Sequence, residues 1–233
     1  MSLTLKSPAA PQTHDASTLR VAIVHARWNA VIVDQLVAGA QKQLRTLGVP
    51  DANIELVSVP GSWELPGAVQ RLYAASQLQS ASSAHGGGSN TSASADLLGP
   101  SASSTDLTRS SGTKGQPPSY QETQTRSSTS TSTSTPKTPF DAIIAVGVLI
   151  KGETMHFEYI SSSVSEGLMR VQLDAGVPVV FGVLTVVEEK QAIARAGMGP
   201  ALEKKRRNVG EEWAEVAVEM GARRRAWAEG RIV

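Results

Sequence analysis

The chain has 233 residues, of which 40% are hydrophobic and 18% charged, and its formal net charge is +1. This near-neutral balance gives no electrostatic reason to expect a nucleic acid or a membrane surface as partner. The absence of cysteine excludes disulfides, thiolate catalysis and cysteine-ligated metals. The longest apolar run, around Ile143 to Ile150, is much shorter than the ~20 residues that span a bilayer, so we expect a soluble protein.

Two segments have the composition of disordered regions. Residues 1–19 contain Ser, Thr and Pro with scattered apolar residues and show no secretory-signal pattern. In residues 79–138 nearly half of the side chains are Ser or Thr, and none is Val, Ile, Phe or Trp. Such segments cannot bury enough apolar surface to offset the entropy of ordering them. We therefore expect a disordered leader at 1–19 and a single domain at 20–233, interrupted by a disordered insertion at 79–138.

The remainder of the chain alternates between strand-like and helix-like segments. Short β-branched or almost wholly apolar runs predict four strands, at residues 20–26, 53–59, 140–150 and 178–185. Apolar spacings of three and four, with Gly and Pro stops, predict helices at residues 32–47, 64–78, 157–171, 188–196 and 208–228. This alternation predicts a parallel four-stranded sheet with helices on both faces, a flavodoxin-like α/β/α sandwich of three layers.

Ligands in such folds bind beyond the carboxyl ends of the strands. The strand-to-helix loops should therefore lie along one rim of the sheet and contain the site. These loops are residues 27–29, 60–64, 151–156 and 185–187.

The third of these loops belongs to the stretch GVLIKGETMH, Gly147 to His156, which has the glycine spacing of a nucleotide P-loop. A P-loop reads G-x-x-x-x-G-K-[ST], whereas Glu153 stands here in place of the lysine and would repel a triphosphate. The residues between the glycines are mostly strand formers, which places Gly147 inside the strand and Gly152 alone in the turn. The pattern therefore argues against a nucleotide site.

A glycine turn that opens a helix nevertheless offers free backbone N–H groups and a positive dipole end, which suffice for one phosphate. Thr154 either adds a hydroxyl donor to this site or caps the helix. His156 is either an exposed first-turn histidine or a group that moves protons beside the phosphate. We find no serine–histidine–acid set, no paired catalytic carboxylates and no metal-ligand spacing elsewhere.

Several blocks of the chain resemble the 6,7-dimethyl-8-ribityllumazine synthase family and occur in that family's order. The blocks are IVHARWN, VPGSWELP, AVGVLIKGETMHFEY, GVPVVFGVLT, QAIARAG and NVGEEWAEVAVEM. The resemblance implies the condensation of 5-amino-6-ribitylamino-uracil with 3,4-dihydroxy-2-butanone 4-phosphate, without metal or organic cofactor. It also implies that His156 transfers protons and that phosphate is bound by Gly152, Glu153, Thr154 and Arg195.

The resemblance further assigns positions to the pyrimidine ring and the ribityl chain. These positions are Trp28, Ser62, Trp63, Glu64, Leu149, Ile150 and Phe181, and we expect Asn29 beside them. Each has a simpler alternative: the tryptophans could pack under loops, Glu64 could be a helix-start acid, and Arg195 an ordinary surface arginine. The basic clusters at 204–207 and 223–225 are interpreted as a solvated helix face or a helix C-terminus.

The family builds its site between subunits of a pentamer, to which Phe181 and Arg195 match positions contributed by the neighbour. We expect a cytoplasmic pentamer, while a shell of twelve pentamers remains an alternative. One departure from the family is Asn208-Val209-Gly210, where a basic residue is usual in the middle, and the spacer before it is long. Two other functions therefore stay open: a non-catalytic flavin or lumazine binding module, and a flavodoxin-like electron carrier.

Overall fold

The computed structural model describes residues 12–85, 138–199 and 207–232. Residues 1–84 and 136–233 form one compact unit, and residues 85–135 are assigned to a second. Most of the expected insertion, the first eleven residues of the expected leader and residues 200–206 of the spacer lie outside the described part of the chain. The fold below is that of the first unit.

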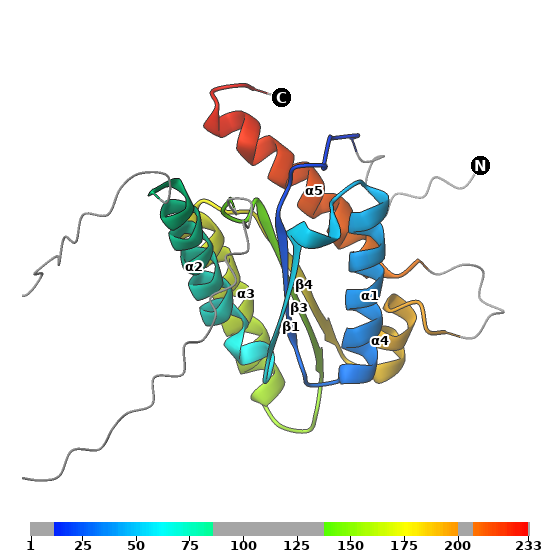
Figure 1. Cartoon of the computed structure of the whole chain (residues 1–233). Coiled ribbons are helices and arrows are strands. Elements are labelled where there is room, and N and C mark those ends of the chain that lie inside the picture. Colours follow the sequence, from blue (N-terminus) through cyan, green and yellow to red (C-terminus); the bar gives the residue numbers. More distant parts are fainter. Residues whose placement is uncertain (1–11, 86–137, 200–206, 233) are drawn as a thin grey trace, which may run out of the picture. The chain divides into compact units, whose positions relative to one another are not determined.

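The four expected strands form one parallel sheet (Figure 1). They are β1 (Val21–Ala26), β2 (Ile54–Val59), β3 (Ala142–Ile150) and β4 (Val179–Val186). Their order is β2-β1-β3-β4, so the chain moves outward from β1 to β2 and then returns across β1 to β3. β3 lies in the interior of the sheet and its first seven residues are buried, which explains its continuous apolar sequence.

Helices cover both faces of this sheet, which confirms the predicted three-layer fold (Figure 1). One face carries α1 (Ala30–Thr46), α4 (Glu189–Arg195) and α5 (Val209–Ala228), and the other carries α2 (Leu65–His85) and α3 (His156–Ala175). Two short 3-10 helices, η1 (Asp51–Asn53) and η2 (Ser62–Glu64), flank β2. Side chains alternate along β1: Val21 and Ile23 enter the core under α1, while Ala22 and Val24 enter the core under α2 and α3.

Helices α1 and α5 approach each other closely because glycine occupies the contact. A Cβ on Gly210 would lie 2.1 Å from the carbonyl oxygen of Leu36. Asn208 caps α5 by accepting the N–H of Gly210 at 2.8 Å, and its amide donates to the carbonyl of Gln35 at 2.6 Å. The first and last residues of the Asn208-Val209-Gly210 motif therefore have structural roles that do not depend on the residue between them.

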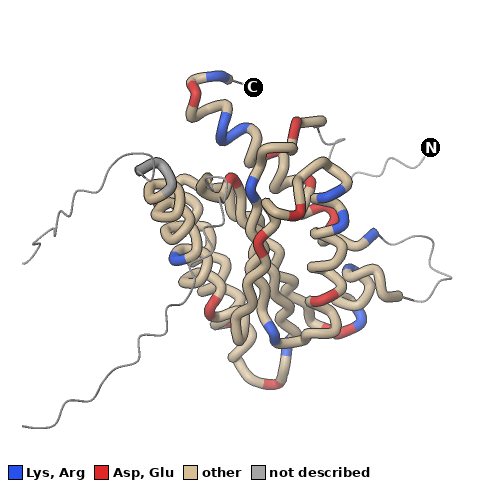
Figure 2. The backbone as a smooth tube through the Cα atoms, viewed as in Figure 1, with Lys and Arg blue, Asp and Glu red and all other residues tan. Residues whose placement is uncertain are grey.

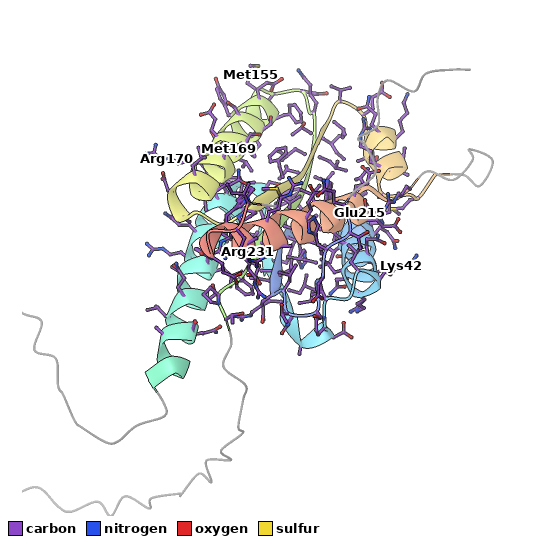
Figure 3. The ribbon with its side chains drawn as sticks, turned by 90° about the horizontal axis from the view of Figure 1, so that it is seen from above. Lys42, Met155, Met169, Arg170, Glu215 and Arg231 are labelled. Carbon is purple, nitrogen blue, oxygen red and sulfur yellow. The ribbon has the colours of Figure 1, made fainter. Side chains whose placement is uncertain are left out.

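Polar pairs extend the same helix contact toward solvent. Gln43 of α1 donates to Glu215 of α5 at 3.0 Å, and Lys42 lies 3.8 Å from Glu211; Lys42 and Glu215 are labelled in Figure 3. Lys and Arg are interspersed with Asp and Glu over the described chain, as Figure 2 shows. None of the described helices has the length and apolar character needed to cross a membrane.

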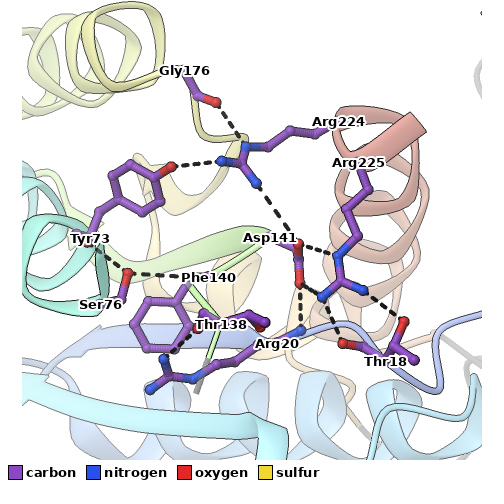
Figure 4. A network of polar contacts seen from close by, with 10 residues as sticks. All are labelled: Thr18, Arg20, Tyr73, Ser76, Thr138, Phe140, Asp141, Gly176, Arg224 and Arg225. Carbon is purple, nitrogen blue, oxygen red and sulfur yellow. Dashed lines mark hydrogen bonds and ion pairs between the residues drawn. The ribbon is translucent and has the colours of Figure 1, made fainter. Parts of the chain in front are cut away.

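A buried carboxylate joins distant parts of the chain at the amino edge of the sheet (Figure 4). Asp141, directly before β3, is 3% exposed. It accepts the backbone N–H of Arg20 at 2.7 Å and two guanidinium nitrogens of Arg225, Nε at 2.5 Å and Nη2 at 2.6 Å. Arg225 also donates to the hydroxyl and the carbonyl of Thr18. The network thus connects the residues directly before β1 and β3 with the last turns of α5.

Arg20 joins the two flanks of the expected insertion. Its guanidinium stacks over the ring of Phe140 at 4.1 Å and donates to the carbonyl of Thr138 at 2.8 Å (Figure 4). It also donates to Gln79 Oε1 at 3.1 Å. The first and the last residue of the expected insertion are therefore held by a single side chain.

Two boundaries predicted from composition, the end of the leader and the start of the insertion, differ from those in the structure. Ala16 and Leu19, inside the expected leader, are each 1% exposed and belong to the core under α1. α2 continues to His85, past the compositional change at Gln79. Isolated apolar residues and helix-compatible Ala, Gln and Ser extend the folded region at both places, an effect that average composition does not reveal.

The basic cluster at 223–225 lies near the C-terminus of α5, one of the two positions considered for it. Its side chains are not simply solvated. Arg224 donates to the hydroxyl of Tyr73 at 2.7 Å and to the carbonyl of Gly176 at 3.0 Å, while Arg225 binds Asp141 (Figure 4). Of the other cluster only Arg207 is described, and it pairs with Glu211 and Glu215.

We predict that Asp141→Ala lowers the free energy of unfolding by about 3 kcal/mol, because it leaves the N–H of Arg20 and the Arg225 guanidinium without their buried acceptor. Urea denaturation at fixed protein concentration measures the change. Asp51→Ala, which removes the exposed partner of Arg45, is the matched control and should cost less than about 1 kcal/mol. Equal effects of the two substitutions would contradict a special role for the buried network.

Candidate active site

A pocket of about 780 Å³ opens at the carboxyl edge of the sheet, beside the ends of β2, β1 and β3. The strand order reverses between β1 and β3, and such a switch point is where open α/β sheets bind ligands. The loops expected to line the site after the first three strands all contribute to it. Ten of the candidate residues line this pocket: Trp28, Asn29, Ser62, Trp63, Glu64, Leu149, Ile150, Gly152, Thr154 and His156.

The turn after β1 is held in an unusual backbone conformation. Asn29, the N-cap residue of α1, has φ 59° and ψ 40°, and it is the only non-glycine residue with positive φ in the described part of the chain. Asparagine tolerates this left-handed region better than most residues. The Asn29 amide donates to the carbonyl of Val148 in β3 at 2.9 Å. The turn after β1 is thereby tied to the strand that forms the floor of the pocket.

The two candidate tryptophans stand at the pocket with most of their surface free. Trp28 is 72% exposed and Trp63 is 59% exposed. The Trp28 ring lies against the backbone of Gly61, where a Cβ would be 3.2 Å from Trp28 Cδ1. Tryptophans that only packed under loops would be buried, so the structure does not support that alternative.

Glu64 caps a helical turn and also lines the pocket. Its Oε2 accepts the N–H of Gly61 at 2.9 Å, which closes the η2 turn at the start of α2. The same side chain is exposed and lines the pocket. A capping function and a ligand-binding function are therefore compatible at this position.

The turn after β3 has the form expected from the sequence. Gly147 lies inside β3, Gly152 lies in the turn, and α3 begins at His156. The N-cap residue of α3 is Met155, which makes no side-chain cap, and Thr154 lines the pocket instead of capping the helix. The N–H groups of His156 and Phe157 precede the first i−4 hydrogen bond of α3, from Tyr159 to Met155, and such groups at a helix start can bind an anion.

An ion pair spans this turn. Lys151 Nζ lies 2.5 Å from Glu158 Oε1, and the backbone N–H of Lys151 donates to the carbonyl of Val186 at 2.9 Å. Hydrogen bonding from the Lys151 ammonium holds the pKa of Glu158 below its ordinary value. The pair connects the end of β3 with the first turn of α3 on either side of Gly152 and His156.

Three candidates do not line the pocket of this chain. Glu153 is exposed in the turn after β3. Phe181 is 45% exposed on β4, an edge strand of the sheet. Arg195 is exposed in the last turn of α4, where its Nη1 donates to the carbonyl of Gln191 at 3.1 Å.

Tyr159 is a pocket residue that the sequence reasoning missed. It is 68% exposed and follows His156 by three positions on α3, so both side chains lie on one helix face. Phe157 and Ile160 also reach the pocket, although their spacing identified them only as residues of a helix packed on the core. In the described residues no three His, Cys, Asp or Glu side chains come together as metal ligands do.

A flavodoxin-like fold with a pocket at its switch point is the architecture of a ligand-binding α/β protein. The chain matches the family model described as 6,7-dimethyl-8-ribityllumazine synthase over residues 18–86 and 125–225. It is 56% identical over 221 residues to the 6,7-dimethyl-8-ribityllumazine synthase of Pyricularia oryzae, covering 95% of this chain and 96% of the relative. The synthases of Schizosaccharomyces pombe and Stenotrophomonas maltophilia are 36% and 34% identical, with at least 86% of each chain covered.

The chain therefore belongs to the 6,7-dimethyl-8-ribityllumazine synthase family, a family of transferases. This confirms the resemblance drawn from the sequence blocks.

We predict that Lys151→Met raises the pKa of Glu158 toward its ordinary value, because the hydrogen bond that stabilises the carboxylate is lost. The pair contributes stability above the ordinary glutamate pKa and loses it as the pH falls through the lowered value. A carbon-13 NMR titration of labelled glutamate measures the shift. Lys190→Met, which removes the exposed partner of Glu188, should leave the Glu158 titration unchanged.

Proposed function

We propose that this pocket condenses 5-amino-6-ribitylamino-uracil with 3,4-dihydroxy-2-butanone 4-phosphate to give 6,7-dimethyl-8-ribityllumazine, with release of phosphate and two waters. The observation that carries the proposal is the convergence of a glycine turn, a histidine and two exposed tryptophans on one pocket. The family membership supports the same reaction. Holding two substrates together supplies much of the rate in such a reaction, since orientation can contribute ~7–11 kcal/mol.

The phosphate of the butanone substrate binds at the turn after β3 in this proposal. Gly152 and the first residues of α3 offer backbone N–H groups, Glu153 contributes through its main chain, and Thr154 offers a hydroxyl. Arg195 supplies a guanidinium from a neighbouring subunit, where its two-pronged geometry suits a phosphate. A site of this kind takes a single phosphate rather than a nucleotide.

His156 transfers protons during imine formation, phosphate elimination and ring closure. It lines the pocket directly after the phosphate turn, and histidine can donate or accept a proton near neutral pH. These steps move protons among nitrogen, carbon and oxygen and require no electron transfer. The chemistry therefore needs neither a metal nor an organic cofactor.

The pyrimidine ring stacks on Trp28, with Trp63 beside it. Ser62, Glu64 and Asn29 offer polar groups to the ribityl chain and the pyrimidine edge, together with the backbone at Leu149 and Ile150. The exposure of both indole rings supports a role in ligand contact. Phe181 of a neighbouring subunit closes the ring site.

The site is completed between subunits of a homo-oligomer, which we propose to be a cytoplasmic pentamer. The exposure of Phe181 and Arg195 outside the chain's own pocket supports a contribution to a neighbour. The alternative of a non-catalytic binding module rests on Val209 and the long spacer. It is weakened because Asn208 and Gly210 keep their structural contacts.

The direct test mixes both substrates with the purified protein and follows lumazine absorbance. We predict that His156→Ala lowers kcat by about 10²-fold, as loss of one acid–base group does, with little change in either KM. Arg170→Ala on the exposed side of the same helix is the control and should keep wild-type kinetics. Absence of lumazine formation by the wild-type protein, together with tight lumazine binding, would instead identify a binding module.

We predict that Arg195→Ala raises the KM for the butanone phosphate by about 10- to 100-fold, the effect of losing a charge-assisted hydrogen bond, and leaves the pyrimidine KM unchanged. Mixing equal amounts of Arg195→Ala and His156→Ala subunits tests whether one site takes these two residues from different chains. If the two residues come from different chains, random mixing restores both groups in about a quarter of the sites. No gain in activity on mixing would place both residues in the same chain's site.

A further inference from the structure

Two helix starts in this chain are closed by the side chain of their third residue. At η2, Glu64 Oε2 accepts the backbone N–H of Gly61 at 2.9 Å. At α4, Gln191 Oε1 accepts the backbone N–H of Val187 at 3.1 Å and that of Glu188 at 3.4 Å. Each side chain reaches back to the N-cap residue, as in a capping box. A helix start that is closed in this way has fewer free N–H groups for an anion.

The start of α3 has the same kind of residue at the third position, yet it is not closed. Glu158 is the third residue of α3, and Met155 is the N-cap residue. A glutamate at this position can reach back to the N–H of the N-cap residue. α3 nevertheless has no side-chain cap. Its start faces the pocket, since Thr154, His156 and Phe157 line that pocket.

The Glu158 carboxylate is bound by Lys151 instead. Lys151 Nζ lies 2.5 Å from Glu158 Oε1, whereas Glu158 Oε2 is shielded from solvent and has no hydrogen-bond partner among the described residues. The carboxylate lies close to the helix start, because after Lys151 its own backbone N–H is the next cause that lowers the pKa of Glu158. It therefore has a free acceptor oxygen near the N–H groups that an anion would use.

We propose that Lys151 is a positioning residue for the phosphate substrate: its ammonium holds the Glu158 carboxylate so that this side chain does not cap α3. The N–H groups at the start of the helix then stay free for the phosphate. This inference rests on the proposed function, and Lys151 acts through Glu158, since Lys151 itself does not line the pocket. The charges agree with this role, because the ion pair is neutral as a whole, whereas an unpaired carboxylate at this place would repel a phosphate.

The test is a double-mutant cycle of Lys151→Met, Glu158→Ala and the double variant. Its readouts are both KM values and the inhibition constant of inorganic phosphate. We expect Lys151→Met to raise the KM for the butanone phosphate and the phosphate inhibition constant about 5- to 10-fold, the size of a capping interaction that the substrate must displace. Glu158→Ala should raise neither. In the Glu158→Ala background, Lys151→Met should add less than about 2-fold, and the pyrimidine KM should not change in any variant.

A crystal structure of Lys151→Met shows directly whether the carboxylate has moved. We expect the Glu158 side chain to accept the backbone N–H of Met155, as Glu64 accepts that of Gly61 in the wild-type protein. The Glu158 pKa still rises in this variant, because a neutral amide replaces the ammonium as its partner.

Lys42→Met is the matched control. Lys42 Nζ lies 3.8 Å from a carboxylate oxygen of Glu211, which is the third residue of α5, and that helix start is capped by Asn208. This variant removes the same kind of ion pair away from the pocket, so both KM values should keep their wild-type values. Lys151→Arg retains the positive charge and should keep the KM for the butanone phosphate within about 2-fold of wild type.

Three outcomes would overturn the proposal. An unchanged KM for the butanone phosphate in Lys151→Met would show that Glu158 does not close the helix start. Equal increases with and without Glu158 would show that the lysine attracts the phosphate by its own charge. Failure of Lys151→Met to fold would show a structural role for the pair. In each case lumazine formation by the wild-type protein leaves the proposed function standing, whereas a wild-type protein that forms no lumazine removes that function and this inference with it.

Discussion

The reversal of strand order between β1 and β3 is the constraint on which the site depends. β1 passes through α1 to β2 on one side, and α2 then leads the chain back to β3 on the other side. Because all four strands are parallel, the turns after β1, β2 and β3 meet at one edge of the sheet. The side chains brought together there come from positions more than one hundred residues apart, and the hydrogen bond from Asn29 to Val148 connects the turn after β1 with β3.

Buried polar groups are well paired at the amino edge of the sheet, whereas the carboxyl edge retains strained, unpaired or exposed groups. At the amino edge, the buried charge of Asp141 has several charged and neutral donors, and Arg20 has aromatic and carbonyl partners. At the carboxyl edge, Asn29 has a left-handed backbone and two indole rings are exposed, while the buried hydroxyl of Ser62 has no hydrogen-bond partner among the described residues. Functional sites commonly retain such locally unfavourable features while the rest of the fold stabilises them.

Most of the fold and much of the pocket could be predicted from the sequence, because both depend on local patterns. The apolar runs and the helical spacings located the four strands and the five α-helices but not the short helices η1 and η2, and the turn at Gly152 was recognised from glycine spacing and strand formers. The binding of Asp141 by Arg225 could not be predicted, since 84 positions separate the two and nothing local connects them. The close approach of Ser62 to Gly147 likewise follows only from how η2 packs on β3.

The flanks of the expected insertion and the pocket lie at opposite edges of the sheet. Gln79 and Thr138, the outermost residues of the expected insertion, are both held by Arg20 directly before β1, whereas the pocket lies beyond the carboxyl ends of the strands. The entropic cost of closing a loop grows only weakly with its length, so a long segment between these flanks costs little more than a short one. Because the two flanks meet at Arg20, away from the pocket, the interruption between α2 and β3 leaves the turns that line the pocket in place.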